Sequence, residues 1–322
     1  MVAAPPGDFI EVQGYDIGGQ GGLVYCASTT EKPAELFWRP AGATESVQLT
    51  QVNAPFLSEI IVQPTHEVRY ESYDGSSVQG WYILPVGYEA GKRYPLIVNI
   101  HGGPRIMYNP ASKMWHEWQH LAARGYIVFF CNAHGSDGYG QQYQLKSYGE
   151  VDLPDHMAGV DLLIEKGLVD EARMAVWGGS YGGYMTAWTV THTDRFATAI
   201  AERGVYNLLS HYGTTDFPMP TPQEFDVNPW EDPMLMWRYS PLAYAHQIKT
   251  PLLLIHSEND YRVLISEAEQ LFSFMRLSGS APVELLRFPR EGHGLSRNGE
   301  PEHRIIRLEA ILEWFDRYCK PD

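Results

Sequence analysis

The sequence has few cysteines and no long apolar run. Its three cysteines, Cys26, Cys131 and Cys319, are odd in number and far apart, which fits neither a disulfide framework nor a zinc ribbon. We therefore expect a reducing compartment, the cytoplasm. Apolar runs such as YIVFFC at 126–131 are far too short to span a bilayer, and the first ten residues lack the basic start and the apolar stretch of a signal peptide. No membrane association is expected.

Positive charge is also scarce. The chain of 322 residues has 24 Lys and Arg against 39 Asp and Glu, which gives a formal net charge of −15. Such a surface repels the phosphates of nucleic acids and of anionic lipids, so we expect neither as a partner. Hydrophobic residues at 44% and charged residues at 20% are ordinary globular values, which excludes a disordered or fibrous chain.

The pattern of predicted secondary structure changes near residue 58. From Phe9 to about Thr50, short β-type runs alternate with Gly, Pro and Thr turns, which predicts an antiparallel β-meander that is marginal alone. After residue 65, two strands form a hairpin, and apolar strands then alternate with helical stretches. We predict a meander domain over residues 1–58 and an α/β domain over residues 59–322. The exposed meander edge also suggests the hypothesis of a homo-oligomer.

Six apolar runs in the second domain predict buried strands. They are PLIVNIH (95–101), YIVFFCN (126–132), RMAVWG (173–178), FATAIAE (196–202), PLLLIHS (251–257) and VELLRFP (283–289). Helix-patterned stretches lie between them near 112–124, 154–166, 181–192, 263–278 and 301–319. With the hairpin, these runs predict an eight-stranded, mostly parallel sheet covered by helices on both faces, which is the α/β-hydrolase fold.

A serine flanked by glycines follows the strand RMAVW. The segment GGSYG at 178–182 places Ser180 at a strand-to-helix junction, which is the pattern of a nucleophile elbow. A serine on so sharp a turn has close neighbours, so side chains at Gly178 and Gly182 would clash. The alternative is a chance match among 30 glycines, which the flanking strand and helix disfavour.

A nucleophilic serine needs a base, and the base needs a carboxylate that orients it. In this fold the acid follows the second strand after the nucleophile, and the histidine follows the last strand. The first of these loops offers Glu258 and Asp260, and the second offers His293 between two glycines. We predict Ser180, Asp260 and His293 as a catalytic triad for acyl transfer, with Glu258 as the alternative acid.

Acyl transfer also needs backbone N–H groups directed at the oxyanion. One candidate is the amide of Tyr181, which directly follows the predicted nucleophile. The other lies in His-Gly-Gly-Pro at 101–104, which follows the strand PLIVNI as the histidine-glycine motif of esterases does. The alternative for this second motif is a plain tight turn.

The segment HEWQH at 116–120 matches the zincin pattern HExxH. On the predicted helix 112–124, Met114, Trp115, Trp118, Leu121 and Ala122 form an apolar stripe, which would put His116, Glu117 and His120 on the solvated face. No third ligand is visible nearby. We therefore predict no metal and no cofactor, and we disfavour both a metallopeptidase and a non-catalytic module, since every part of a serine hydrolase is present.

Longer motifs carry a family resemblance from about residue 60 to 320. HGGP, LAARGYIVFF, GSDGYG, WGGSYGGY, RGVYNLLSHYGTTDFP, PWEDP and REGHGLSRNGEPEHR resemble the catalytic domain of the prolyl-oligopeptidase superfamily, in its acylaminoacyl-peptidase branch. By this resemblance Ser180, Asp260 and His293 match the family's triad, and the amides of Gly103 and Tyr181 match its oxyanion hole. The resemblance implies cleavage of short peptides with a blocked N-terminus and, in many members, of simple esters.

The sequence departs from this family in its N-terminal part and, more locally, at Ala133-His134 and at Leu264, where the family often has proline. The family carries a β-propeller before the catalytic domain, whereas residues 1–58 look like its last blade only, so we expect a more open active site. Because an ester needs less help than an amide to expel its leaving group, a stand-alone carboxylesterase or amidase is the alternative function. In addition, Ala133 and His134 stand where Pro-Arg is expected.

The residues that contact the substrate are not marked by a motif as the triad residues are. The aromatic-rich stretch 211–237 lacks periodicity and lies where this fold inserts substrate-covering elements, so Phe217, Phe225 and Trp230 are predicted to form an apolar pocket. The alternative is that they fasten the insertion to the body. His101 stands where related branches have an oxyanion tyrosine, and Arg262 is expected either to reach the substrate or to form a salt bridge. The expected partner is a small ester or a short acylated peptide.

Overall fold

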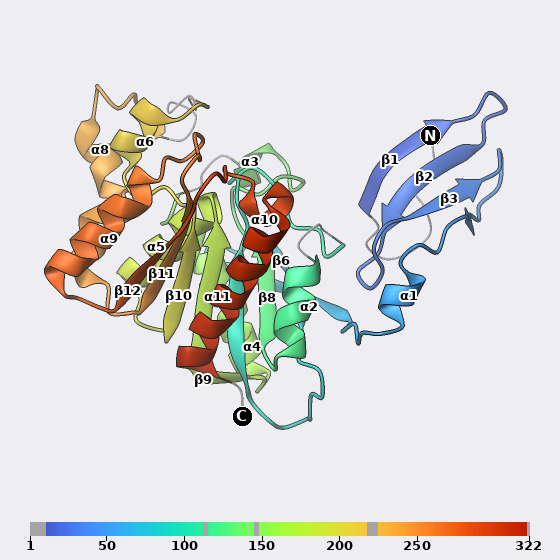
Figure 1. Ribbon diagram of the computed structural model, residues 1–322, viewed down its shortest axis with the longest axis horizontal. Coiled ribbons are helices and arrows are strands. Elements are labelled where there is room, and N and C mark those ends of the chain that lie inside the picture. The colour runs from blue at the N-terminus through green and yellow to red at the C-terminus, as the bar shows by residue number, and fades with distance from the viewer. Residues whose placement is uncertain (1–10, 112–114, 145–147, 218–224, 321–322) are drawn as a thin grey trace.

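The computed structural model describes residues 11–111, 115–144, 148–217 and 225–320. Residues 9 and 10 of the predicted meander, 112–114 of the predicted helix and 218–224 of the predicted insertion lie outside this part of the chain. Two sheets are present, a small antiparallel one at the N-terminus and a large, mostly parallel one (Figure 1). Within the described residues, none of the helices has both the length and the apolarity of a membrane span.

Eight strands form the large sheet, in the order β12-β11-β10-β9-β7-β8-β6-β5. The antiparallel hairpin consists of β5 (Thr65–Glu71) and β6 (Ser77–Ile83), and β6 also pairs antiparallel with β8. The other neighbours are parallel, namely β7 (Tyr94–Ile100), β8 (Ile127–Asn132), β9 (Val169–Gly179), β10 (Thr198–Glu202), β11 (Leu252–Ser257) and β12 (Val283–Phe288). The predicted α/β-hydrolase fold is confirmed.

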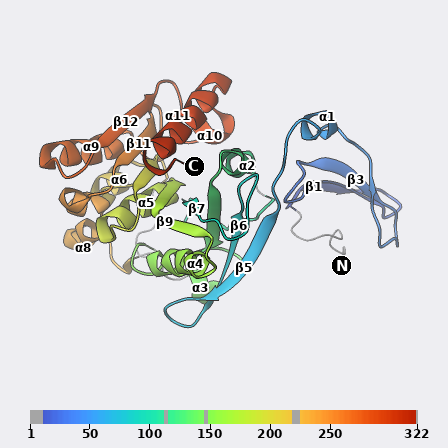
Figure 2. The same cartoon turned by 90° about the horizontal axis from the view of Figure 1, so that it is seen from below.

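The parallel strands are apolar on both faces, which is why helices cover both faces of the sheet. Every residue of β7 and β8 is buried. Successive side chains point to opposite faces, so Val98 and Ile97 belong to different hydrophobic cores. One core is completed by α4 (Leu153–Glu165), α5 (Tyr181–His192) and α9 (Ser266–Ser278), and the other by α2 (Trp115–Ala123) and α11 (Pro301–Cys319) (Figure 2).

The connections carry shorter helices. They are α3 (Gln141–Gln144), α6 (Leu208–Thr214), α8 (Pro233–Arg238), the 3-10 helix η1 (Pro241–Gln247) and α10 (Leu295–Asn298). Side chains cap two of them, because Asn207 accepts the amide of Leu209 at the start of α6 and Asp232 accepts that of Leu235 at the start of α8. The irregular insertion predicted at 211–237 therefore contains local helical order at both of its described ends.

The small sheet is a meander in chain order. Its strands are β1 (Glu11–Ile17), β2 (Leu23–Ser28), β3 (Glu35–Arg39) and β4 (Val47–Gln48), followed by α1 (Ala54–Leu57). Its core consists of Leu23, Tyr25 and Ala27 with Phe37 packed against them, too little for independent stability. The Ser28 hydroxyl donates to a carbonyl of the α/β body, that of Ala111, at 3.2 Å. The division at residue 58 stays a prediction; α1 ends at Leu57 and β5 begins at Thr65.

The structure corrects the predicted solvated face of α2. His116 and His120 are exposed, but Glu117 is buried, and its Oε1 accepts from Nη1 of Arg307 at 2.7 Å. The same guanidinium donates to both carboxylate oxygens of Glu202, at 2.5 and 2.6 Å. A buried carboxylate requires such partners. Periodicity within α2 could not reveal this burial, because the partner is 190 residues away.

Candidate active site

Ser180 lies at the end of β9 in a rarely adopted backbone conformation, with φ 61° and ψ −122°. Its neighbours leave no space for side chains. A Cβ on Gly178 would lie 2.5 Å from the carbonyl oxygen of Gly182, and a Cβ on Gly182 would lie 2.1 Å from that of Ile100. The Ser180 amide donates to the carbonyl of Glu202 at 2.9 Å. This turn therefore requires the two glycines that the motif contains.

The structure brings the three predicted triad side chains into one chain of hydrogen bonds. His293 Nε2 lies 3.0 Å from Ser180 Oγ, and His293 Nδ1 lies 2.7 Å from Asp260 Oδ2. The three residues follow β9, β11 and β12, whose carboxyl ends meet at one edge of the sheet. This arrangement can pass a proton from a hydroxyl to an imidazole that a carboxylate orients.

Asp260 is buried and ionised. Burial raises the pKa of Asp260, but the hydrogen bond and the charge of His293 outweigh this, so that the pKa lies below its usual value. The other oxygen, Oδ1, accepts the amides of Arg262 and Val263 at 3.0 and 2.9 Å, which fixes the carboxylate. The alternative acid, Glu258, is exposed and accepts from Arg287 instead.

The surroundings of His293 favour the neutral imidazole. Burial lowers the pKa of His293, the hydrogen bond to Asp260 acts in the opposite direction, and the nearby charges of Arg203 and Arg297 lower the pKa further. The net result is a pKa below the ordinary histidine value. A neutral Nε2 can accept the proton of Ser180.

We expect kcat/KM to rise with pH through one ionisation below 6.5, the ordinary value for histidine. Neutral His293 is the competent form, so activity is full above its pKa and is lost as the pH falls through that pKa. Initial rates with a p-nitrophenyl ester, measured from acid to neutral pH, give the inflection. An inflection above the ordinary histidine value would contradict the electrostatic account of the site.

Two backbone amides lie next to Ser180. The Gly102–Gly103 turn passes so close that a Cβ on Gly102 would lie 3.3 Å from Ser180 Cβ. Tyr181 begins α5, where the first amides have no acceptor within the helix. Among the described residues, no carbonyl accepts the amide of Gly103 or of Tyr181. Both amides could therefore donate to an oxyanion, and this role stays a prediction.

The side chain of Tyr181 anchors the start of α5. Its hydroxyl donates to Asp152 Oδ2 and accepts the amide of Tyr148, both at 2.6 Å. Burial of Asp152 raises the pKa of this carboxyl to about 7. These two hydrogen bonds fix the phenol of Tyr181 and, through it, the first residue of α5.

A cavity of about 390 Å³ lies in front of Ser180 and His293. Two predicted substrate residues, Phe217 and Arg262, are part of its wall. The guanidinium of Arg262 lies over the ring of Phe217, 4.8 Å from the centroid, and donates to Asp216 at 2.7 Å. Arg262 thus forms a salt bridge and also borders the cavity.

Three predicted substrate contacts are corrected by the structure, because His101, Phe225 and Trp230 are outside the described wall of the cavity. His101 is buried, with Nε2 2.9 Å from Ser136 Oγ and Nδ1 2.6 Å from the carbonyl oxygen of Gly102. It therefore holds the Gly102–Gly103 turn in place and does not face the cavity.

The two aromatic residues are placed differently. The ring of Phe225 packs against those of Tyr148 and Tyr239, at centroid distances of 5.0 and 5.2 Å. Trp230 is 71% exposed and contacts Tyr212 edge-on. The alternative stated from the sequence fits Phe225, which fastens the insertion to the body. Trp230 fits neither expectation, because it lies at the surface.

Sequence reasoning missed two arginines in the cavity wall, Arg203 and Arg297. Arg203 is buried beside the nucleophile turn, and a Cβ on Gly179 would lie 2.9 Å from its guanidinium. A signal for it was present, because the charged pair Glu202-Arg203 ends an otherwise apolar, buried strand. Arg297, on α10, offered no such signal.

A second hydroxyl–imidazole–carboxylate chain lies elsewhere on the sheet. Ser76 Oγ is 3.2 Å from His134 Nε2, and His134 Nδ1 is 2.7 Å from Asp155 Oδ2. The hydrogen bond to Asp155 raises the pKa of His134, and Asp74 adds a second carboxylate at 3.3 Å. Both carboxylates favour the protonated imidazole, which cannot accept a serine proton, so we interpret this chain as a link between the β5–β6 turn and α4.

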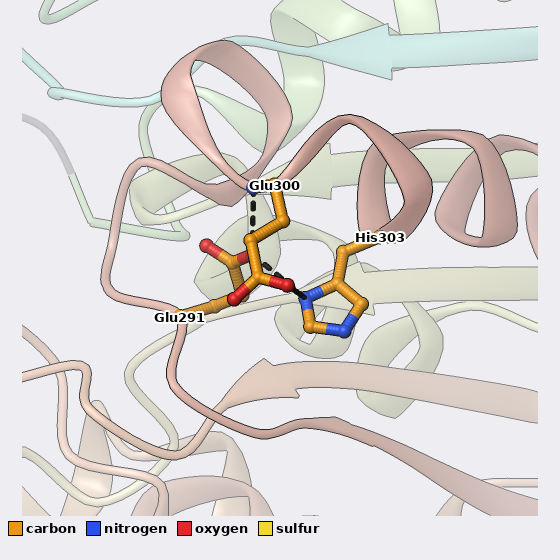
Figure 3. A group of neighbouring side chains, drawn as sticks. All are labelled: Glu291, Glu300 and His303. Carbon is orange, nitrogen blue, oxygen red and sulfur yellow. Dashed lines mark hydrogen bonds and ion pairs between the residues drawn. The ribbon is translucent and has the colours of Figure 1, made fainter.

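One further cluster, formed by Glu291, Glu300 and His303, has ligand atoms within 4.8 Å of one another (Figure 3). Its atoms already have partners. Glu291 Oε1 accepts from the amide of Glu300 at 2.8 Å and from His303 Nδ1 at 2.7 Å, while Arg290 donates to both oxygens of Glu300. The cluster lies at the start of α11, where the helix dipole disfavours a cation, and the bond from the Glu300 amide to Glu291 links the loop of His293 to this helix.

Comparison with known proteins gives two family matches. The model of the Prolyl oligopeptidase family matches residues 112–322, and that of Acetyl xylan esterase (AXE1) matches residues 27–159. The uncharacterized peptidase YuxL of Bacillus subtilis (strain 168) is 41% identical over 301 residues, which cover 91% of this chain and 45% of that protein. An acylamino-acid-releasing enzyme of Arabidopsis thaliana is 33% identical over 72% of this chain and 31% of its own length.

A solved structure agrees over nearly the whole chain. The acylaminoacyl peptidase of Pyrococcus horikoshii, uncomplexed, has a TM-score of 0.89 at 33% identity, covering 98% of this chain and 50% of that one. The chain thus spans half or less of the length of these three relatives. Fold, motifs and family match agree with the resemblance seen in the sequence, and the chain belongs to the prolyl oligopeptidase family of serine hydrolases.

Proposed function

We propose that this chain hydrolyses N-acylated short peptides and simple acyl esters through an acyl-enzyme on Ser180. One observation carries the proposal: Ser180 Oγ, His293 and Asp260 form a continuous chain of hydrogen bonds, at 3.0 and 2.7 Å. Beside it lie the amides of Gly103 and Tyr181, for which the described part of the chain provides no carbonyl acceptor.

The reaction follows from these positions. Ser180 Oγ attacks the substrate carbonyl while His293 Nε2 takes its proton, and ionised Asp260 stabilises the imidazolium. The amides of Gly103 and Tyr181 donate to the oxyanion of the tetrahedral intermediate. His293 then gives the proton to the leaving nitrogen or oxygen, which departs. Water, activated by the same imidazole, hydrolyses the ester on Ser180 and releases the acid.

The charges of the cavity support a blocked N-terminus in the substrate. Among the described residues, its wall contains no Asp or Glu that would bind a free α-ammonium group. It does contain the guanidiniums of Arg203, Arg262 and Arg297, which would repel that group. An acylated amino terminus carries no charge and avoids this repulsion. The names of the relatives from Arabidopsis and Pyrococcus agree with this substrate class.

A stand-alone carboxylesterase or amidase is the second candidate. The match of residues 27–159 to the Acetyl xylan esterase (AXE1) model favours it, and an ester has the better leaving group. The two candidates share the triad and the oxyanion hole. They differ in whether an amide bond is broken.

Three substrates separate the possibilities, namely acetyl-alanine p-nitroanilide, alanine p-nitroanilide with a free amine, and p-nitrophenyl acetate. We expect the acetylated anilide to exceed the free-amine anilide by at least about 10-fold in kcat/KM, because one unfavourable charge contact is removed. Turnover of the ester alone would support the carboxylesterase. A preference for the free amine would contradict the proposed substrate class, and no turnover of any substrate would contradict the proposed function.

A further inference from the structure

Two arginines form a cationic corner of the cavity beside His293. Arg203 and Arg297 both belong to the cavity wall, and both charges act on the imidazole of His293. Charge at Arg297 also lowers the pKa of Arg203, and both arginines line the same cavity as His293. Arg203 forms an ion pair with the buried carboxylate of Glu202, at 3.8 Å from its Nη1, which helps to fix the guanidinium.

Neither arginine has its full set of partners. The side chain of Arg203 is 10% exposed, and within the described residues its Nε has no hydrogen-bond partner. Arg297 is exposed, and no carboxylate in the described part of the chain pairs with it. By contrast, the third arginine of the wall, Arg262, is already paired with Asp216. In one cavity wall, a buried guanidinium with an unused donor and an exposed guanidinium without a carboxylate among the described residues can together bind a carboxylate.

The position of the corner indicates which part of a substrate it meets. His293 Nε2 must protonate the leaving group, so the leaving group lies on the side of the imidazole. Arg297 lies on α10, the first helix after His293, and its amide donates to the carbonyl of Gly294 at 2.8 Å. Phe217 and Arg262 border the cavity from the insertion and from the Asp260 loop instead.

We propose that Arg297, supported by Arg203, binds the free α-carboxylate of the leaving amino acid, and that preferred substrates are therefore N-acylated dipeptides. One residue spans at most about 3.6 Å, so a carboxylate one residue beyond the scissile bond stays beside His293. In a longer peptide that position holds a neutral amide. The proposal rests on the proposed function and adds the chemical class of its leaving group.

The test compares acetyl-Ala-Ala with its carboxamide, acetyl-Ala-Ala-NH2, by measuring released alanine or alaninamide. The native chain is expected to favour the free acid by about 10- to 100-fold in kcat/KM, since a bidentate arginine–carboxylate pair is lost with the amide. Arg297→Gln should reduce this preference to within about 3-fold. Arg297→Lys should retain part of it, because the charge remains while the fork geometry is lost.

The ratio of the two substrates is the quantity of interest, because any change in the titration of His293 affects both substrates alike. Arg276→Gln is the matched control: Arg276 is exposed on α9, lies outside the described cavity wall, and its replacement removes the same charge. It should leave the ratio as in the native chain. Equal rates for acid and amide in the native chain would overturn the inference, as would an unchanged preference in Arg297→Gln.

Failure of the inference is distinguishable from failure of the proposed function. Turnover of p-nitrophenyl acetate and of acetyl-alanine p-nitroanilide without any carboxylate preference would contradict the dipeptide inference alone. Absence of turnover with all of these substrates would contradict the proposed function itself.

Discussion

Replacing Ser180 with alanine is expected to lower kcat by roughly 10⁴- to 10⁶-fold, with KM little changed. The substitution removes the atom that forms the acyl-enzyme, while the cavity and the two oxyanion amides remain. The remaining rate reflects substrate binding and oxyanion stabilisation alone. Steady-state kinetics with p-nitrophenyl acetate, on protein shown by circular dichroism to be folded, gives both constants. His293→Ala should have an effect of similar size, because the nucleophile then has no base.

The chain provides a matched control for this experiment. Ser76 also faces an imidazole, that of His134, and His134 contacts the carboxylate of Asp155. Because the two carboxylates near His134 favour its protonated form, we expect Ser76→Ala to keep kcat within about 2-fold of the native value. A large loss in Ser76→Ala together with an active Ser180→Ala would reverse the assignment of the nucleophile.

Replacing Asp260 with asparagine is expected to lower kcat by about 10⁴-fold. Ionised Asp260 keeps the proton of His293 on Nδ1 and leaves Nε2 free to accept from Ser180. An asparagine amide can donate to Nδ1 instead, which moves the ring proton to Nε2 and removes the base. The remaining side-chain oxygen can still accept the amides of Arg262 and Val263, so the loop should keep its shape. Kinetics at a pH well above the His293 pKa isolate this effect.

Glu258→Gln is the control for the choice of acid. Glu258 is exposed, and its carboxylate is paired with Arg287 on β12. Loss of one surface ion pair costs little, so we expect kcat within about 2-fold of the native value. A greater loss in Glu258→Gln than in Asp260→Asn would contradict the geometry of the site.

The triad could be predicted from sequence because its parts follow strands of one sheet. Ser180 and His293 are 113 residues apart, yet each follows the carboxyl end of a parallel strand, and such ends meet at one edge. The tight turn at Ser180 requires glycines on both sides, and the sequence motif shows them directly. The fold class and the meeting of the triad residues could therefore be predicted from the order of the strands along the chain.

Other features of the site depend on contacts that no local pattern contains. Glu117 was predicted on a solvated face, and it is buried because Arg307 of a distant helix pairs with it. Phe217 borders the cavity while Trp230 is exposed, although both lie in one irregular stretch without periodicity. Side chains in such a segment take their direction from the elements it packs against, which the sequence order does not give.

The family resemblance allowed a more specific prediction of the substrate class than the residues alone. The motifs alone predict acyl chemistry, whereas the proposed preference for an acylated amino terminus was first implied by the family resemblance. The structure adds an independent physical argument, since the described cavity wall holds three arginines and no carboxylate. His101 shows that a residue at an equivalent position need not have the role known from related branches. It occupies the place of an oxyanion tyrosine in related branches, but its ring is buried against Ser136.

Covalent labelling can identify the nucleophile without any assumption about the substrate. The protein is treated with a p-nitrophenyl phosphonate, its intact mass is measured, and the modified peptide is sequenced by mass spectrometry. We expect one adduct per chain, located on Ser180, with loss of esterase activity in proportion to labelling and no adduct in Ser180→Ala. An adduct on another residue that abolishes activity, or full activity after complete labelling of Ser180, would show that Ser180 is not the nucleophile.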